Sequence, residues 1–246
     1  MKKIFIKAVI VILFLMSHIN YSQNIVSEVI YKKHISVDLS KKEKGLASDI
    51  LAKSFQKMED LEYVLIFNKK ESLFKEKETM VSDDGANALS NSLSKMLGGG
   101  NDIFYTNLKD RKILQQKEFS SKFFIIESFF KKNNWEMSNE NKKIGKDLCY
   151  KATSTMAIET IRGTKIKEVI AWYNPLIPSS FGPVGYGGLP GLIVELNVGE
   201  IIFAAKEISL KKFKNLKIEP PKKGQVITEE EFQEIVKKGF DKYKRD

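Results

Sequence analysis

Residues 181–193 read FGPVGYGGLPGLI, and this run of glycine and proline decides how the rest of the chain is organised. Four of the six prolines lie within residues 175–190, and five of the fifteen glycines lie within residues 182–191. Proline fixes the backbone angle φ, whereas glycine permits positive φ and close approach of two backbones. The composition therefore predicts a tight loop with few accessible conformations, which leads directly into an apolar strand at residues 192–196.

Outward from this loop, most of the chain has the pattern of β-strands. Residues 25–38 alternate between apolar and polar side chains, which is typical of a half-buried strand. Residues 123–130 are apolar on both faces, so we expect this strand to be covered on both sides. Further strands are predicted at residues 62–67, 72–77, 103–108, 112–118, 119–129, 148–161, 165–173 and 200–210, with a short piece around Trp135.

Helices are predicted in fewer places. Residues 45–58 carry apolar side chains at helical spacing. In residues 228–243, Thr228 and Glu231 have the spacing of a capping box, and the apolar stripe that follows either docks on the sheet or meets a partner. Residues 83–97 are either a plain surface helix or a mobile flap.

This succession of elements predicts an α+β fold. We expect a curled, many-stranded antiparallel sheet, half-barrel-like in shape, with a few covering helices. A sheet with this many strands curls rather than staying flat, and a covered concave face makes a cavity. Residues 23–246 are expected to form a single domain.

The N-terminus has the features of a secretory signal peptide. Three lysines form a basic region, residues 8–16 are apolar, and the small residue Ser22 precedes the expected cleavage point. This apolar run is too short for a transmembrane helix, which needs about 20 residues. We therefore expect residues 1–22 to be removed and the chain to be exported to the periplasm or cell surface without spanning a membrane. An uncleaved N-terminal anchor is the alternative.

The formal net charge of the whole chain is +10, and lysines and acidic residues are interspersed along it. Because an exported protein rarely meets nucleic acid, we expect no nucleic-acid partner. We interpret the positive excess as a source of solubility and of attraction to anionic envelope surfaces. The single cysteine cannot form an intrachain disulfide, so the fold depends on its core.

Several motifs together resemble the GLPGLI family of secreted bacterial envelope proteins. The family motif itself matches residues 188–193. Other segments that resemble the family are residues 62–68 with Ser72, Trp135, Ile144-Gly145, residues 149–153, Ala171-Trp172-Tyr173, Ile177-Pro178 and Gly182-Pro183. The chain departs from the family at residues 145–148, where an aromatic residue is expected after the glycine. The resemblance implies secretion and no established activity, and some members look like companions of outer-membrane uptake receptors.

Few residues could support catalysis or metal binding. Outside the predicted signal peptide the chain has one histidine, His34, and one cysteine, Cys149. These cannot build a usual zinc site, so we expect neither a metal nor another cofactor. Cys149 is either a small buried hydrophobe or a reactive thiol whose pKa a neighbouring lysine lowers. Such a thiol would be redox-sensitive or would bind a soft metal such as Cu(I), with a methionine as second ligand. The acidic runs Asp83-Asp84 and 229–231 could do acid–base work, although the second is typical of a helix start.

Residues around the glycine–proline loop are candidates for binding a ligand or a partner. They are Trp172, Tyr173, Phe181, Tyr186, Leu189 and Pro190. Their rings either form a recognition surface or pack inside as a structural corner. We predict an exported, non-catalytic binding protein that holds an apolar small molecule in the concave face, or an envelope protein such as an outer-membrane uptake receptor through the loop at residues 178–190. A hydrolase or a thiol- or metal-dependent envelope enzyme is the alternative, and a purely structural envelope component is a third interpretation.

Overall fold

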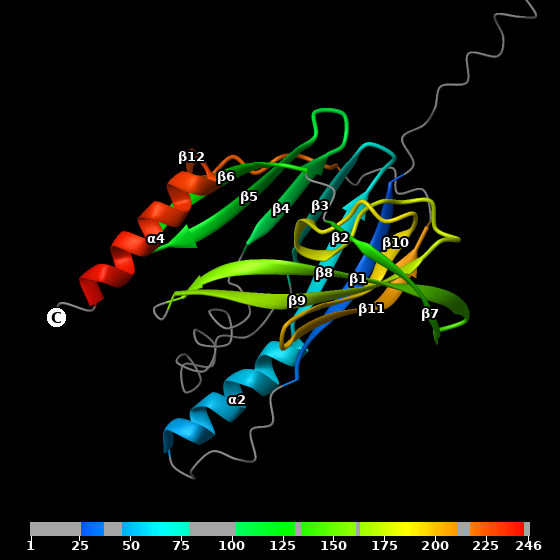
Figure 1. The fold of residues 1–246 in the computed structure, drawn as a ribbon, viewed down its shortest axis with the longest axis horizontal. Helices are drawn as coiled ribbons and strands as arrows, with labels where there is room; N and C mark the ends of the chain where they lie inside the picture. Colours follow the sequence, from blue (N-terminus) through cyan, green and yellow to red (C-terminus); the bar gives the residue numbers. More distant parts are fainter. Residues whose placement is uncertain are drawn as a thin grey trace, which may run out of the picture.

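The computed structural model describes residues 26–36, 46–78, 102–130, 134–160, 163–210 and 217–243. In these residues, twelve β-strands form one sheet, accompanied by two α-helices and a short 3₁₀ turn (Figure 1). In chain order the elements are β1 (Ser27–Ile35), α2 (Leu46–Asp60), β2 (Glu62–Phe67), β3 (Glu71–Glu76), β4 (Ile103–Asn107), β5 (Lys112–Phe119), β6 (Lys122–Phe129), β7 (Glu136–Ile144), β8 (Asp147–Thr160), β9 (Gly163–Asn174), η3 (Pro183–Gly185), β10 (Leu192–Val198), β11 (Ile201–Ser209), β12 (Gln225–Thr228) and α4 (Glu229–Tyr243).

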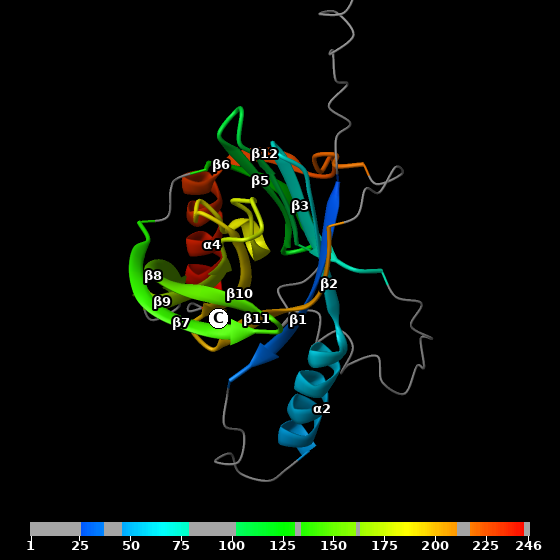
Figure 2. The same ribbon diagram turned by 90° about the vertical axis from the view of Figure 1, so that its right-hand side faces the viewer.

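The sheet consists of two meanders that meet where β1 pairs with β11. Along the sheet the strand order is β12-β6-β5-β4-β3-β2-β1-β11-β10-β9-β8-β7. Strands β1 to β6 are successive neighbours in one half, and β7 to β11 are successive neighbours in the other. Figure 2 shows that the two halves curl toward each other without closing into a barrel. The predicted fold, a curled many-stranded sheet with few helices, is confirmed.

Two strands at the edges of the sheet differ from the prediction. β12 runs parallel to β6, whereas every other neighbouring pair is antiparallel. It has only four residues and follows a proline-rich linker, so its sequence carries no strand pattern. β7 is longer than the short piece expected around Trp135. Most of its side chains are exposed, and it therefore lacks the apolar alternation that marks the other strands.

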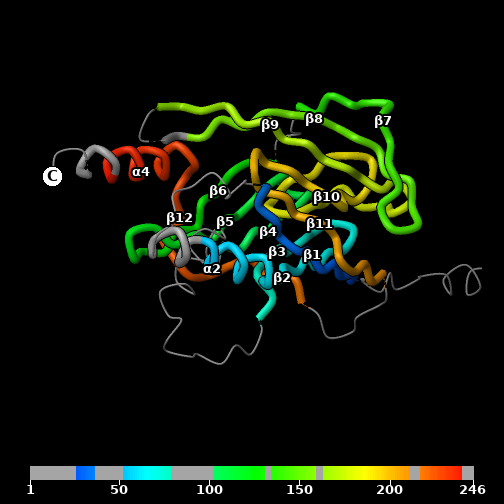
Figure 3. The backbone as a smooth tube through the Cα atoms, turned by 90° about the horizontal axis from the view of Figure 1, so that it is seen from below, coloured from blue at the N-terminus to red at the C-terminus, as the bar shows by residue number. Residues whose placement is uncertain are grey.

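The main core lies on the concave face, between the two halves of the sheet. Tyr63 and Phe74 stack with their ring centroids 5.6 Å apart, and Phe203 packs edge-on against both rings. Figure 3 shows β7, β8 and β9 as a layer apart from β1, β2 and β3, with β10 between them. A smaller cluster covers the outer face of β1 and β2, where Ile30 and Val64 pack with Ile218.

Helix α4 docks on the sheet, which is one of the two outcomes that its apolar stripe predicted. The backbone N–H of Thr228 donates to the Glu231 carboxylate at 2.8 Å, and the N–H of Glu231 donates to the Thr228 hydroxyl at 3.2 Å. This confirms the capping box. Phe232 packs edge-on against Phe119 and Phe124, which places the helix on β5 and β6.

The middle of strand β6 is buried on both faces, as its apolar sequence predicted, whereas Phe129 at its end is 66% exposed. Phe124 and Ile126 pack with α4, and the side chain of Ile125 is buried on the opposite face. Beside it, the ammonium of Lys223 lies 3.5 Å from the ring centroid of Phe123. The segment that leads into β12 therefore helps to cover the face of β6 that α4 leaves open.

Two predictions concern residues that the structure does not describe. They are the signal peptide at residues 1–22 and the helix or flap at residues 83–97, which includes Asp83-Asp84. Neither of the two described helices is long and apolar enough to cross a membrane.

Candidate functional site

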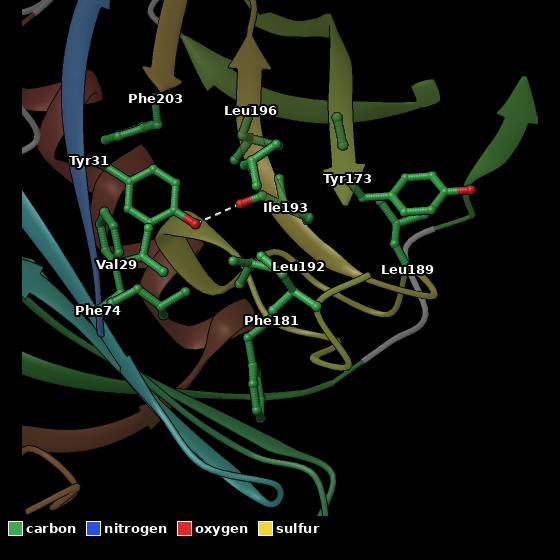
Figure 4. Close-up of a cluster of buried hydrophobic side chains, with 14 of the residues drawn as sticks. Val29, Tyr31, Phe74, Tyr173, Phe181, Leu189, Leu192, Ile193, Leu196 and Phe203 are labelled. Atoms are coloured by element: carbon green, nitrogen blue, oxygen red, sulfur yellow. Dashed lines mark hydrogen bonds between the residues drawn. The ribbon is translucent and has the colours of Figure 1, made fainter. Parts of the chain in front are cut away.

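The loop between β9 and β10, residues 175–191, turns back into the concave face of the sheet (Figure 4). Within it, Phe181 is 2% exposed and Leu189 is 1% exposed. The N–H of Ile193 donates to the carbonyl of Phe181 at 3.1 Å, which fixes the loop to the start of β10. The 3₁₀ turn η3 in this loop contacts β3 and β4 of the other half. The loop therefore joins the two halves of the sheet.

Two glycines of the loop lie where a side chain has no room. A Cβ atom on Gly191 would lie 2.4 Å from the carbonyl oxygen of Asn174. A Cβ atom on Gly187 would lie 2.3 Å from the carbonyl oxygen of Ser180. Both neighbours are backbone atoms, so an alanine would force the main chain to move. The glycines therefore allow the loop to pack against its own backbone and against the end of β9.

Two aromatic side chains hold the loop by donating hydrogen bonds to its carbonyl groups. The Tyr31 hydroxyl donates to the carbonyl of Ile193 at 2.6 Å, and burial raises the pKa of this phenol. The indole Nε1–H of Trp135 donates to the carbonyl of Gly187 at 2.9 Å. Tyr31 belongs to β1 and Trp135 immediately precedes β7, so each half of the sheet contributes one of these bonds.

The six predicted binding residues lie at different depths. Tyr173, Phe181 and Leu189 are buried, Trp172 and Tyr186 are half-buried, and Pro190 is exposed. Much of the loop is therefore a packed corner, and a binding role for these residues stays a prediction. Three other loop residues, Pro175, Leu176 and Pro178, are exposed, and Leu176 is 73% exposed. The sequence analysis did not single out Leu176, because the alternation of β9 ends before it.

Cys149 on β8 is buried, with 1% of its surface exposed. Its sulfur lies 3.8 Å from the carbonyl oxygen of Asp147. Burial is the largest influence and raises the pKa of the thiol, although the backbone of Ile144 and the ammonium of Lys142 act in the opposite direction. A reactive thiol needs a lowered pKa and access to solvent. The surroundings of Cys149 therefore favour the structural role over the reactive one.

The lysine beside this thiol is engaged by other groups. The ammonium of Lys142 contacts the two carboxylate oxygens of Glu195 at 2.9 and 2.8 Å. The same ammonium lies 4.4 Å from the ring centroid of Trp172, which covers one side of that predicted binding residue. This lysine therefore links β7 to β9 and β10 across the outer face of the sheet.

A cluster of charged side chains lies among the aromatic residues of the concave face. Lys33 on β1 is 2% exposed, and its ammonium lies 5.3 Å from the ring centroid of Phe203 and 6.0 Å from that of Tyr63. Burial lowers the pKa of Lys33 to about 8, even though the carboxylates of Asp102 and Glu76 act to raise it. Lys33 is thus a cation within the main apolar core.

The second part of this cluster is an ion pair at the start of β4. One carboxylate oxygen of Asp102 accepts hydrogen bonds from Lys117 at 2.8 Å and from Gln115 at 2.9 Å. Burial nevertheless raises the pKa of Asp102. Converging groups with shifted pKa values occur at functional sites and also in structural ion-pair networks. The cluster brings two lysines, a carboxylate and an amide together on the concave face.

The sequence patterns did not predict this cluster, although Lys33 carried one signal of it. Lys33 has the same strand parity as Tyr31 and Ile35, so it is a charged residue at an apolar position of an alternating strand. Its neighbours could not be foreseen in the same way. Asp102 and Lys117 come from distant segments that only the sheet topology brings to Lys33.

The residues considered for metal or acid–base chemistry are separated in space. Among the described residues, no group of three or more His, Cys, Asp and Glu side chains could hold a metal ion. His34 is exposed, and its Nδ1 lies 3.8 Å from the Glu59 carboxylate. The acidic run at residues 229–231 forms the first turn of α4, where Glu231 completes the capping box.

Comparison with known proteins gives a family match over a short region. The model of a family described as "Protein of unknown function (Porph_ging)" matches residues 159–195. These residues comprise the end of β8, β9, the 175–191 loop and the start of β10. No sequence among curated proteins matches this chain.

The fold is similar to that of part of a larger solved protein. The structure of PNGF-II in the P21 space group matches with a TM-score of 0.51 and 13% sequence identity, over 86% of this chain and 33% of that chain. The structure of PNGF-II in the C2 space group matches with the same TM-score and identity, over 86% of this chain and 32% of that chain. This chain therefore spans about a third of the length of those structures. At this identity the likeness shows the fold alone.

Proposed function

We propose that this chain is an exported, non-catalytic binding protein of the bacterial envelope, of the GLPGLI kind, which binds a partner protein through the exposed part of the 175–191 loop. The observation that carries the proposal is the exposure of Leu176 on a rigid base. Leu176 is 73% exposed, whereas the next residue, Ile177, is buried in the main core. An apolar side chain that a packed corner holds in solvent gains free energy when a partner protein buries it.

The rigidity of the loop supports this proposal. Prolines flank the exposed segment at positions 175 and 178, and the N–H of Leu176 donates to the side-chain oxygen of Asn174 at 2.9 Å. Asn174 is itself buried. A loop that is already ordered loses little conformational entropy when a partner binds, so more of its contact energy is available as affinity.

The packing of the concave face favours a protein partner over an apolar small molecule. Phe181 and Leu189 of the loop belong to the same core cluster as Tyr63, Phe74 and Phe203 of the sheet. The apolar side chains that were expected to line a ligand cavity thus contact the protein's own loop. The buried thiol of Cys149, with its raised pKa, gives no support to the alternative of a thiol-dependent enzyme.

Export and the class of partner are part of the same proposal. Export is supported by the basic, apolar and small-residue pattern of residues 1–22. The resemblance to GLPGLI proteins suggests an outer-membrane uptake receptor as the partner. Residues 159–195, which match the family of unknown function, contain the whole of the loop that we propose to bind.

A photo-crosslinking amino acid placed at position 176 of the full chain, expressed in a bacterial host with an envelope, tests the proposal. The control carries the same amino acid at position 166, because Ile166 on β9 is also apolar and 62% exposed. We expect a discrete crosslinked envelope protein from position 176 and none from position 166. Equal patterns from the two positions, or no crosslinked protein from position 176, would overturn the proposal.

A further inference from the structure

The exposed Leu176 lies next to the turn that joins β7 to β8. The side-chain amide of Asn174, at the end of β9, donates to the Asp147 carboxylate at the start of β8 at 2.9 Å. The other end of that amide accepts the N–H of Leu176. The β7–β8 turn and the first residues of the 175–191 loop are therefore held together by the buried side chain of Asn174.

A second exposed leucine and two exposed lysines belong to the β7–β8 turn and to the strand ends beside it. Leu148 is 40% exposed and pairs across the ladder with Lys143. Lys146 lies in the turn itself, and both lysine side chains are exposed. We call Lys143, Lys146, Leu148 and Leu176 the Leu176 corner. It combines apolar and positively charged groups where Asn174 joins the β7–β8 turn to the 175–191 loop.

The two lysines of this corner differ from the neighbouring Lys142 in whether they form ion pairs. Lys142, one residue before Lys143, is fixed by the Glu195 carboxylate. Within the part of the chain that the structure describes, neither Lys143 nor Lys146 forms an ion pair. The only carboxylate in the turn, that of Asp147, accepts the hydrogen bond from Asn174. The positive charge of the corner is therefore directed to solvent and is available to a partner.

We propose that the partner of this corner is a protein that offers an apolar pocket for Leu176, rimmed by carboxylates that face Lys143 and Lys146. This inference rests on the proposed function and adds the chemistry of the partner's surface. A desolvated apolar anchor within a charged rim is a common arrangement of protein interfaces. The apolar contact sets how long the complex lasts, and the rim charges set how fast it forms and how strongly salt weakens it.

A lipid surface fits the corner less well than a protein. Two leucine side chains carry fewer apolar carbons than a single acyl chain, and one acyl chain gives only marginal, reversible membrane binding. Leu176 also lies between Asn174 and Ile177 and their neighbours in the packed core, since both of these residues are buried. A side chain that is already held in place loses little entropy when it enters a pocket of matching shape, so its affinity for that pocket is higher. A fluid bilayer has no fixed shape to match, so the same rigidity adds little affinity for it.

The test uses the protein captured from position 176, identified by mass spectrometry, purified and bound to the immobilised full chain. The variants are Lys143→Glu with Lys146→Glu, Leu176→Asp, and a control with Lys109→Glu and Lys122→Glu. Lys109 lies in the turn between β4 and β5, and Lys122 is the first residue of β6, and both are exposed in the other half of the sheet. The control therefore has the same change in net charge at a distant place. All variants are first compared with the parent chain by circular dichroism and thermal unfolding.

We expect the Lys143 and Lys146 reversal to slow association at least tenfold at low salt and to remove most of its salt dependence. The control variant is expected to leave the association rate and its salt dependence unchanged. Leu176→Asp is expected to accelerate dissociation. A captured protein that binds the Lys143 and Lys146 variant as well as the parent would overturn this inference while leaving the proposed function intact. If no protein is captured at position 176, both fail.

Vesicles of phosphatidylglycerol and of phosphatidylcholine provide the remaining arm of the experiment. We expect the parent chain to sediment with neither. Sedimentation with phosphatidylglycerol that Leu176→Asp abolishes would replace the protein partner by an anionic lipid surface and overturn the inference.

Discussion

The Tyr31 hydroxyl on β1 donates a hydrogen bond of 2.6 Å to the main-chain carbonyl of Ile193, the last residue of the glycine–proline motif (Figure 4). The two residues are 162 positions apart in the chain, and both are buried. Tyr31 belongs to β1, the first strand of the chain, and Ile193 is the second residue of β10, the strand that follows the loop. The bond therefore connects the two meanders at the centre of the main core.

Replacing Tyr31 with phenylalanine tests how much this bond contributes. The ring is retained, but the buried carbonyl of Ile193 loses a donor, so we expect the free energy of unfolding to fall by about 1–3 kcal/mol. Urea unfolding followed by circular dichroism measures the change. Tyr150→Phe is the matched control, because its ring is half-buried and its hydroxyl makes no hydrogen bond within the described residues. Equal effects of the two variants would show that the Tyr31 bond contributes nothing specific.

Gly191→Ala tests whether the glycines of the motif serve backbone packing. The added methyl group would lie 2.4 Å from the carbonyl oxygen of Asn174, which cannot move without breaking the end of β9. We expect a loss of about 3 kcal/mol in unfolding free energy. In Gly145→Ala, the control, the methyl group meets nothing within 4 Å and only the positive φ is strained. That variant should lose about 1 kcal/mol.

Thermal unfolding of the two alanine variants is the measurement that decides this point. If the Gly191 variant unfolds at the same temperature as the Gly145 variant, the loop has room that the structure does not show. The GLPGLI motif would then need a functional explanation for its last glycine rather than a structural one.

The buried Lys33 predicts a change of stability with pH. Its pKa is lowered from 10.5 to about 8 in the folded protein, so between these values the unfolded chain binds more protons than the folded chain. Stability therefore rises with pH across this window, as the charged form that burial disfavours is lost. Lys33→Met removes the titrating group. We expect the unfolding free energy of the parent, relative to that of this variant, to rise by about 2 kcal/mol between about pH 7 and pH 10.

Lys32→Met is the control for this experiment. Lys32 is adjacent in the chain but has the opposite strand parity, and its ammonium donates to the carbonyls of Glu59 and Asp60 at the end of α2. That variant keeps Lys33, so it should show the same rise with pH as the parent. A parallel pH profile for the parent and the Lys33 variant would mean that Lys33 titrates normally and is not enclosed as the structure shows.

Much of the sheet could be predicted because the strands of its centre have periodic apolar patterns. β1 and β2 were anticipated within a few residues, and the capping box at Thr228 marked the start of α4 correctly. β12 and the full length of β7 could not be anticipated, because their pairing comes from neighbours rather than from their own side chains. An exposed or very short edge strand buries too little apolar surface to leave a periodic pattern.

The site was less predictable than the fold, and the reason is the direction in which side chains point. Composition showed that Phe181, Tyr186 and Leu189 belong to a special loop, but the same composition fits a recognition surface and a packed corner. The choice depends on contacts with β3 and β4, which come from far along the chain. Leu176 and Lys33 were overlooked for the opposite reason, since each is an ordinary residue whose exposure or burial is unusual.

Cys149 gives the sharpest test between a binding protein and a thiol-dependent enzyme. Because the thiol is 1% exposed and burial raises its pKa, little reactive thiolate is available at neutral pH. We expect an aromatic disulfide reagent to label the folded protein at least a hundredfold more slowly than the protein in guanidinium chloride. The control is Thr155→Cys combined with Cys149→Ala, which moves the thiol to an exposed position on the same strand and should label rapidly when folded.

Cys149→Ala alone then separates the two functions. Removal of the buried sulfur leaves a small cavity, so we expect a loss of about 1 kcal/mol in unfolding free energy with capture at position 176 unchanged. A catalytic or metal-binding thiol would instead be labelled quickly in the folded protein, and its replacement by alanine would abolish activity or bound metal without affecting stability. Rapid labelling of the folded protein would thus argue for the enzyme, because a buried, protonated sulfur reacts far more slowly than an exposed thiolate.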